Sequence, residues 1–140
     1  MPREEVVAEV GAWTAKAESD LKAAHLLLQV EDAPFDVICF HAQQAAEKYL
    51  KAALTCHSVP FPKTHDLESL LRLFPAKSSA RSELTDLSEL TDAAVSVRYP
   101  GYLEEYDRDT AESLVQQALQ VKTVVVRELA RLGCPAEGSV

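Results

Sequence analysis

The sequence predicts an all-α protein, a four- to five-helix up-down bundle with two long antiparallel helices at its N-terminus. Apolar residues recur every three or four positions over several long segments, which is the period of an amphipathic helix. No segment combines strict apolar–polar alternation with hairpin turns, so strands are not expected. Helix-breaking residues are also scarce inside these segments, because the chain of 140 residues has only 4 glycines and 7 prolines.

The first long helix is expected from residue 3 to about residue 28. Its buried stripe is marked by five apolar side chains at helical spacing: Trp13, Ala17, Leu21, Ala24 and Leu28. Glu4 and Glu5 suit the positive end of the helix dipole. Residues 30–34 end the helix.

The second long helix is expected to begin with Asp36 as its N-cap and to run to about Cys56. Its apolar face is rich in alanine, which permits close helix approach: Ile38, Ala42, Ala45, Ala46, Tyr49 and Ala53. A separate stripe is polar and carries His41, Gln44, Lys48 and Lys51. Two long helices joined by a short turn are the natural first unit of a bundle.

Shorter elements follow. Residues 59–62 form a stiff extended connector, since each proline disfavours a helical conformation in the residue before it. Thr64 is expected to cap a short helix that ends before Pro75. A fourth helix is expected over about 79–97, and Pro100 and Gly101 stop it.

The last helix is expected to begin with a capping box formed by Asp109 and Glu112 and to run to about residue 132. Its apolar face is Ala111, Leu114, Val115, Ala118, Val121 and Val125. The length fits one domain. The expected division is therefore a single helical domain over 1–132 and a flexible C-terminal tail over 133–140.

Composition excludes several classes of function. A net charge of −8 is unlike that of proteins that wrap nucleic acid passively. No apolar run approaches the ~20 residues of a membrane helix, and the N-terminus lacks a signal peptide, so a cytoplasmic location is expected. The few glycines exclude a glycine-rich phosphate loop. Cys39, Cys56 and Cys134 suggest neither a zinc site nor a disulfide framework, and they are expected to be reduced.

The histidines do not suggest a metal site, since no pair has the i,i+4 spacing that places two imidazoles on one metal ion. No metal and no other cofactor is expected. Basic and aromatic residues do suggest binding of a nucleotide or phosphate. The candidates are Arg98, Tyr99, Lys48, Lys51, His41 and His65. Arginine offers a planar fork of donors to phosphate, and tyrosine offers a face on which a base can stack. The competing interpretation is that these side chains only solubilise a helix surface or cap a helix end.

Three segments carry a resemblance to a known family. They are the run from Phe40 to Ala52, the run from Thr64 to Leu67, and the run from Val97 to Gly101. Together with the stretch from Lys16 to Leu21, they resemble the HEPN domain family, in particular its small stand-alone prokaryotic members. The resemblance covers about residues 8–130.

The resemblance implies a helical bundle that is commonly a homodimer and is often encoded beside a minimal nucleotidyltransferase, as in toxin–antitoxin pairs. Many members are metal-independent ribonucleases whose site is an arginine followed a few positions later by a histidine. Arg98 matches that arginine, but no histidine follows His65 in the chain. No catalytic residue is therefore carried over, and the chain is not expected to be an enzyme on its own.

Three functions stay open at this point. The first is a non-catalytic nucleotide-binding module that acts with a nucleotidyltransferase partner, and it predicts binding near Arg98, Lys48 and Lys51. The second is a ribonuclease that uses His41 or His65 as its acid or base. The third is a dimeric scaffold whose basic residues serve only the fold.

Two further expectations concern nucleotide transfer, which would follow from the first function, and dimerisation, which rests on the alanine-rich faces of the long helices. Tyr99, Tyr102 and Tyr106 are candidate targets for nucleotide transfer by the partner enzyme. A two-fold axis could also bring two copies of Arg98 together, so a cleft at a homodimer interface is expected.

Overall fold

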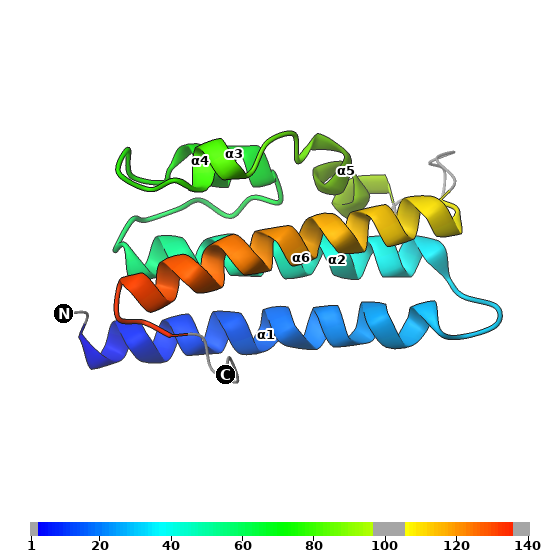
Figure 1. Ribbon diagram of the computed structural model, residues 1–140, viewed down its shortest axis with the longest axis horizontal. Helices are drawn as coiled ribbons and strands as arrows, with labels where there is room; N and C mark the ends of the chain where they lie inside the picture. Colours follow the sequence, from blue (N-terminus) through cyan, green and yellow to red (C-terminus); the bar gives the residue numbers. More distant parts are fainter. Residues whose placement is uncertain (1–2, 97–105, 136–140) are drawn as a thin grey trace.

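The computed structural model describes residues 3–96 and 106–135, and every regular element in those ranges is helical. Six helices follow in order: α1 (Glu4–Leu28), α2 (Phe35–Cys56), α3 (Leu67–Arg72), α4 (Ala80–Glu83), α5 (Ser88–Ser96) and α6 (Arg108–Arg131). In Figure 1 the helix α1 runs opposite to α2, the three short helices make the return, and α6 runs back beside α2. The predicted all-α up-down bundle, with two long N-terminal helices packed together, is confirmed.

The helix α2 is the centre of the fold, because it packs against α1, α3, α5 and α6. The predicted apolar face of α2 is confirmed, since each of its six residues is fully buried. Alanine at four of these positions lets the neighbouring helices come close. The helix is thus enclosed on several sides.

The helix α1 packs mainly against α2 and makes few contacts with α6. Its central apolar stripe is buried as predicted, with Ala17 and Ala24 completely inaccessible to solvent. Trp13 and Leu28, at the two ends of the predicted stripe, are partly buried against the core. The predicted apolar face of α6 is also buried in full.

The predicted N-caps of the second and third helices are each wrong by two residues. Helix α2 begins at Phe35 after Pro34, so Asp36 lies in its first turn and does not cap it. Asp66, and not Thr64, caps α3: its carboxylate accepts a hydrogen bond from the backbone N–H of Glu68. The Thr64 hydroxyl accepts one from the backbone N–H of Asp66, which orients the cap.

The capping box predicted for the last helix is also wrong. Asp107 is the N-cap of α6, and its side chain accepts a hydrogen bond of 2.8 Å from the backbone N–H of Thr110. Asp109 is in the first turn, and Glu112 forms an ion pair with Arg108 at 3.6 Å. The extended backbone of Asp107 allows its carboxylate to reach back to the helix, which residues within the helix cannot do.

The fourth helix predicted over 79–97 is two helices, α4 and α5. Leu84 has extended backbone, and Asp86 has a positive φ of 54°, which is incompatible with a continuous helix. Leu84 and Leu87 are buried on either side of this turn. The bend therefore points both leucines into the core. The predicted stop at Pro100 and Gly101 lies outside the described residues.

The chain continues to pack against the core after α6. Gly133 has a φ of 82°, the left-handed conformation that commonly ends a helix. Cys134 follows with its side chain fully buried and its backbone N–H bonded to the carbonyl of Leu129 at 2.8 Å. Packing thus reaches beyond residue 132. No described helix is long and apolar enough to cross a membrane.

A buried polar cluster connects three distant segments at the far end of the bundle. The carboxylate of Glu128 on α6 accepts a hydrogen bond of 2.5 Å from the Ser78 hydroxyl and lies 2.9 Å from Nε2 of His57. Only 4% of the His57 side chain and 6% of the Glu128 side chain are exposed. Each of these buried groups has a hydrogen-bond partner in the other two. The contacts of Glu128 therefore hold the ends of α2 and α6 to the segment before α4.

Glu18 connects the three long helices. Its carboxylate accepts hydrogen bonds from the buried Tyr49 hydroxyl of α2 and, at 2.7 Å, from the Lys122 ammonium of α6. Burial alone would raise the pKa of Glu18. The hydrogen bonds from Lys122 and Tyr49, together with nearby positive charge, outweigh that effect and hold the pKa below its usual value of 4.5.

This contact predicts a pH-dependent contribution to stability. Because the pKa of Glu18 is lower in the folded state than in the unfolded state, its ionised form stabilises the fold above about pH 4.5. The contribution is lost as the pH falls through the folded-state pKa. Urea denaturation from pH 3 to pH 7 should show Glu18→Gln less stable than the wild type near pH 7, with the difference shrinking at low pH. The exposed Glu9→Gln on the same helix is the control, and an equal pH trend there would contradict the assignment.

Candidate polar site between α1 and α2

Asp20 joins two residues of the predicted polar stripe. Its Oδ1 lies 2.9 Å from Nδ1 of His41, and its Oδ2 accepts a hydrogen bond of 2.5 Å from the Lys48 ammonium. His41 and Lys48 are seven residues apart on α2, two helical turns, so they share one face. One carboxylate on α1 therefore orients an imidazole and an ammonium on α2.

The geometry at Asp20 fixes which ring nitrogen of His41 carries the proton. A carboxylate oxygen only accepts, so Nδ1 must donate its hydrogen to Asp20. Nε2 is then left as an acceptor in the neutral ring, or as a donor when the ring is protonated. The side chain of His41 is 29% exposed and that of Lys48 is 21% exposed, so solvent reaches both.

A second group of charges on α2 is centred on Glu47. The Glu47 carboxylate is 3.0 Å from the Lys51 ammonium and 2.7 Å from Nδ1 of His65. The amide of Gln43 donates to the carbonyl of His65 at 3.0 Å and to Glu47 at 3.3 Å. These contacts attach the segment that leads into α3 to the side of α2. We call the seven residues of the two groups the polar cluster: Asp20, His41, Gln43, Glu47, Lys48, Lys51 and His65.

The two lysines of the cluster have different surroundings. Lys51 is 10% exposed, and besides Glu47 its ammonium lies 5.6 Å from the ring centre of Trp13 and 5.8 Å from that of Phe61. Both distances are within the range of cation–π attraction. Lys51 thus helps to hold the connector, whereas the ammonium of Lys48 is closer to the surface.

The structure places four of the six predicted binding residues in two pairs: His41 and Lys48 share Asp20, and Lys51 and His65 share Glu47. Arg98 and Tyr99 lie outside the described residues, as does Tyr102. The described chain before them ends with α5, which packs against α2. In Figure 1 this helix lies over the N-terminal half of α2, the half that carries His41.

Sequence reasoning missed Asp20 and Glu47 as members of the cluster. Each had a signal. Asp20 comes three residues after Ala17 and just before Leu21, so it borders the buried stripe of α1. Glu47 is four residues from both Gln43 and Lys51, the spacing of neighbours on one helix face.

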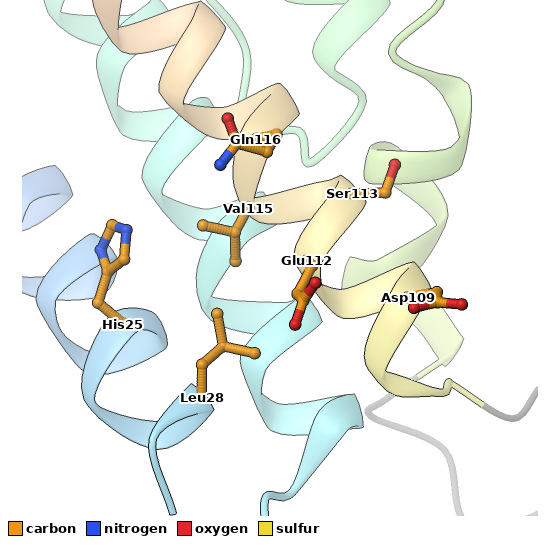
Figure 2. Close-up of a pocket in the computed structure, with 7 residues that line it drawn as sticks. All are labelled: His25, Leu28, Asp109, Glu112, Ser113, Val115 and Gln116. Atoms are coloured by element: carbon orange, nitrogen blue, oxygen red, sulfur yellow. The ribbon is translucent and has the colours of Figure 1, made fainter.

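A groove of about 470 Å³ lies elsewhere, between α1 and α6. Figure 2 shows that its walls come from both helices, with Leu28 and Val115 facing each other and Glu112 beside them. None of the predicted binding residues lines it. Its carboxylates, Asp109 and Glu112, oppose the binding of an anion, and no lysine or arginine of the described chain lines it. In the polar cluster each carboxylate is paired with a lysine, so the cluster is the better candidate for a phosphate group. Among residues 3–96 and 106–135, no three His, Cys, Asp or Glu side chains gather as a possible metal site.

Comparisons with known proteins agree with the resemblance seen in the motifs. The family model described as the HEPN domain matches residues 10–129. A protein of Methanocaldococcus jannaschii named "Putative toxin MJ1304" is 30% identical over 126 residues, which cover 79% of this chain and 81% of that protein. No solved structure matches the chain significantly.

Proposed function

The chain belongs to the HEPN domain family, and on that premise we propose that it is a nucleotide-binding module that is not catalytic on its own. We infer that it acts with a minimal nucleotidyltransferase in a toxin–antitoxin-like pair, as a homodimer in the cytoplasm. The toxin-like part of this proposal is supported by the name of the archaeal relative. The observation that carries the binding function is the pairing of His41 and Lys48 through Asp20.

The His41 ring and the Lys48 ammonium are each held in place by Asp20 and remain accessible to solvent. Asp20 fixes both side chains from the neighbouring helix, so little side-chain entropy is lost when a phosphate binds. The Lys48 ammonium and a protonated His41 ring both offer hydrogen-bond donors to phosphate oxygens. Arg98 is proposed to add a planar pair of donors, and Tyr99 a stacking face for the base.

Binding of a fluorescent ATP analogue tests this proposal. Removing one charged phosphate contact weakens binding by roughly tenfold, so Lys48→Ala and Arg98→Ala should each raise Kd by about that factor. Lys22→Ala, which removes an exposed lysine from α1, is the matched control and should leave Kd within about twofold. Circular dichroism confirms that each variant is folded. Equal affinity in all three variants would refute the assigned site, and no binding by the wild type would favour the scaffold function.

One observation favours a second function, a metal-independent ribonuclease. The carboxylate–imidazole pair of Asp20 and His41 is the arrangement that orients a general base. In such a reaction Nε2 of His41 would take the proton of an RNA 2′-hydroxyl. That oxygen would attack the adjacent phosphorus, giving a 2′,3′-cyclic phosphate and a 5′-hydroxyl that receives its proton from water or a second acid.

Incubation of the purified protein with mixed RNA in the presence of EDTA separates the two functions. If the chain is a ribonuclease, His41→Ala should reduce cleavage by about 100-fold or more, and Asp20→Asn should reduce it as well. His65→Ala and Arg98→Ala show whether those residues contribute. The proposed binding module predicts no cleavage at high protein concentration. Cleavage of equal rate in every variant would indicate a contaminating nuclease.

A further inference from the structure

Two of the three cysteines lie in contact although 78 positions separate them in the chain. Cys56 is the last residue of α2, and Cys134 follows the end of α6. Their thiol groups are close enough to hydrogen-bond to each other. Cys134 is fully buried, whereas Cys56 is partly exposed, so small molecules can reach one side of the pair.

The backbone around both cysteines is fixed by contacts that do not involve sulfur. Next to Cys56, the ring of His57 is 2.9 Å from Glu128 of α6. Next to Cys134, the turn at Gly133 and the hydrogen bond to the Leu129 carbonyl hold the chain against the end of α6. The proximity of the two thiols is therefore a property of the packed helix ends.

We propose that Cys56 and Cys134 are a redox modification site, at which a small-molecule disulfide such as oxidised glutathione converts two thiols into one intramolecular disulfide. In the first step the thiolate of the accessible Cys56 attacks the small disulfide. A mixed disulfide forms and one glutathione thiolate leaves, which takes up a proton. The sulfur of Cys134, after losing its proton to solvent, then attacks the Cys56 sulfur and releases the second glutathione. Two protein thiols are oxidised, and one glutathione disulfide is reduced to two thiols.

The surroundings of the thiols also set the rate of this reaction. Burial, followed by the hydrogen bond that the thiol shares with Cys134 and the negative charge of Glu128, raises the pKa of Cys56 to about 12. The thiolate is therefore rare at neutral pH, and oxidation should be slow compared with that of a free thiol. The pair stays reduced under reducing conditions and is oxidised on prolonged exposure to a disulfide.

Cys39 is the internal control within the same molecule. It is fully buried in the middle of the core, and burial raises its pKa to about 12 as well. Among the described residues, the groups that shift this pKa are carboxylates and include no second cysteine. Because formation of an intramolecular disulfide needs two neighbouring thiols, Cys39 should stay reduced.

The experiment exposes the full chain to excess oxidised glutathione for several hours and counts free thiols after denaturation. The number should fall from three to one, and the intact mass should decrease by two hydrogens. The disulfide should raise Tm by about 10 °C, and dithiothreitol should reverse the change. Cys39→Ser should behave like the wild type. Cys56→Ser and Cys134→Ser should lose the rise in Tm and the intramolecular bond.

Three results would overturn the proposal: three free thiols after exposure, a disulfide only between two chains, or loss of the effect in Cys39→Ser. Because each variant replaces sulfur with oxygen at one atom, a folded wild type with three free thiols is decisive even if one variant does not fold. The outcome is independent of nucleotide binding. The polar cluster contains no cysteine, so failure of either proposal can be recognised separately.

Discussion

Replacing Glu128 by alanine is expected to lower the free energy of unfolding by about 3 kcal/mol. The substitution removes the acceptor shared by Ser78 and His57 and leaves both polar groups without it in a buried position. An unsatisfied buried donor costs about 1–3 kcal/mol, and two are created here. Urea denaturation followed by circular dichroism at pH 7 measures the loss.

Two further variants make this result specific. Glu128→Gln keeps an acceptor oxygen at the same position and should recover part of the stability. Arg127→Ala removes the exposed neighbour, whose ion pair with Glu83 lies at the surface, and should leave the midpoint of unfolding nearly unchanged. If Glu128→Ala were as stable as the wild type, water would have to replace the carboxylate at no cost in free energy. The burial of Glu128 and His57 argues against that result.

Replacing Ala17 by leucine is expected to destabilise the protein by about 1–3 kcal/mol. Ala17 has no exposed surface and lies on the helix that packs almost entirely against α2. A leucine adds three carbon atoms where the alanines of α2 allow close approach, so α1 must move away or the new side chain must adopt a strained rotamer. Thermal and urea denaturation both report the change.

The matched control is Ala15→Leu, two residues away on the exposed side of the same helix. The Ala15→Leu change alters helix propensity by the same small amount, but it places the larger side chain at an exposed position. It should therefore unfold within about 0.5 kcal/mol of the wild type. If both leucine variants were equally stable, close packing of α1 on α2 would not contribute as described.

The long helices could be predicted because their periodic apolar stripes extend over several turns. Residue types at the helix ends were less informative about where each helix begins and ends. Near the start of α6, Asp107 and Asp109 are both good caps by residue type, and only the backbone conformation selects Asp107. The leucines from Leu84 to Leu90 continue a helical spacing across the turn at Asp86. A period alone could not reveal that turn, because no glycine or proline marks it.

The candidate site could be predicted in part. The spacing of His41 and Lys48 placed them on one face of α2. Their shared contact, Asp20, belongs to another helix, and which residues of two helices meet depends on the register between them. That register is set by packing along the full interface, which a single sequence does not display. The role of Lys51 differed for the same reason, since the aromatic rings beside its ammonium come from α1 and the connector.

The central position of α2 has a consequence for the order of synthesis. The ribosome releases α1 and α2 first, and their contacts are close in sequence, so this hairpin should form early. The surface of α2 that later packs against α6 stays uncovered until more than fifty further residues have been made. During that interval the nascent chain displays an apolar surface to other proteins. Translation delayed between α2 and α6 should therefore favour aggregation, whereas a delay after α6 should not.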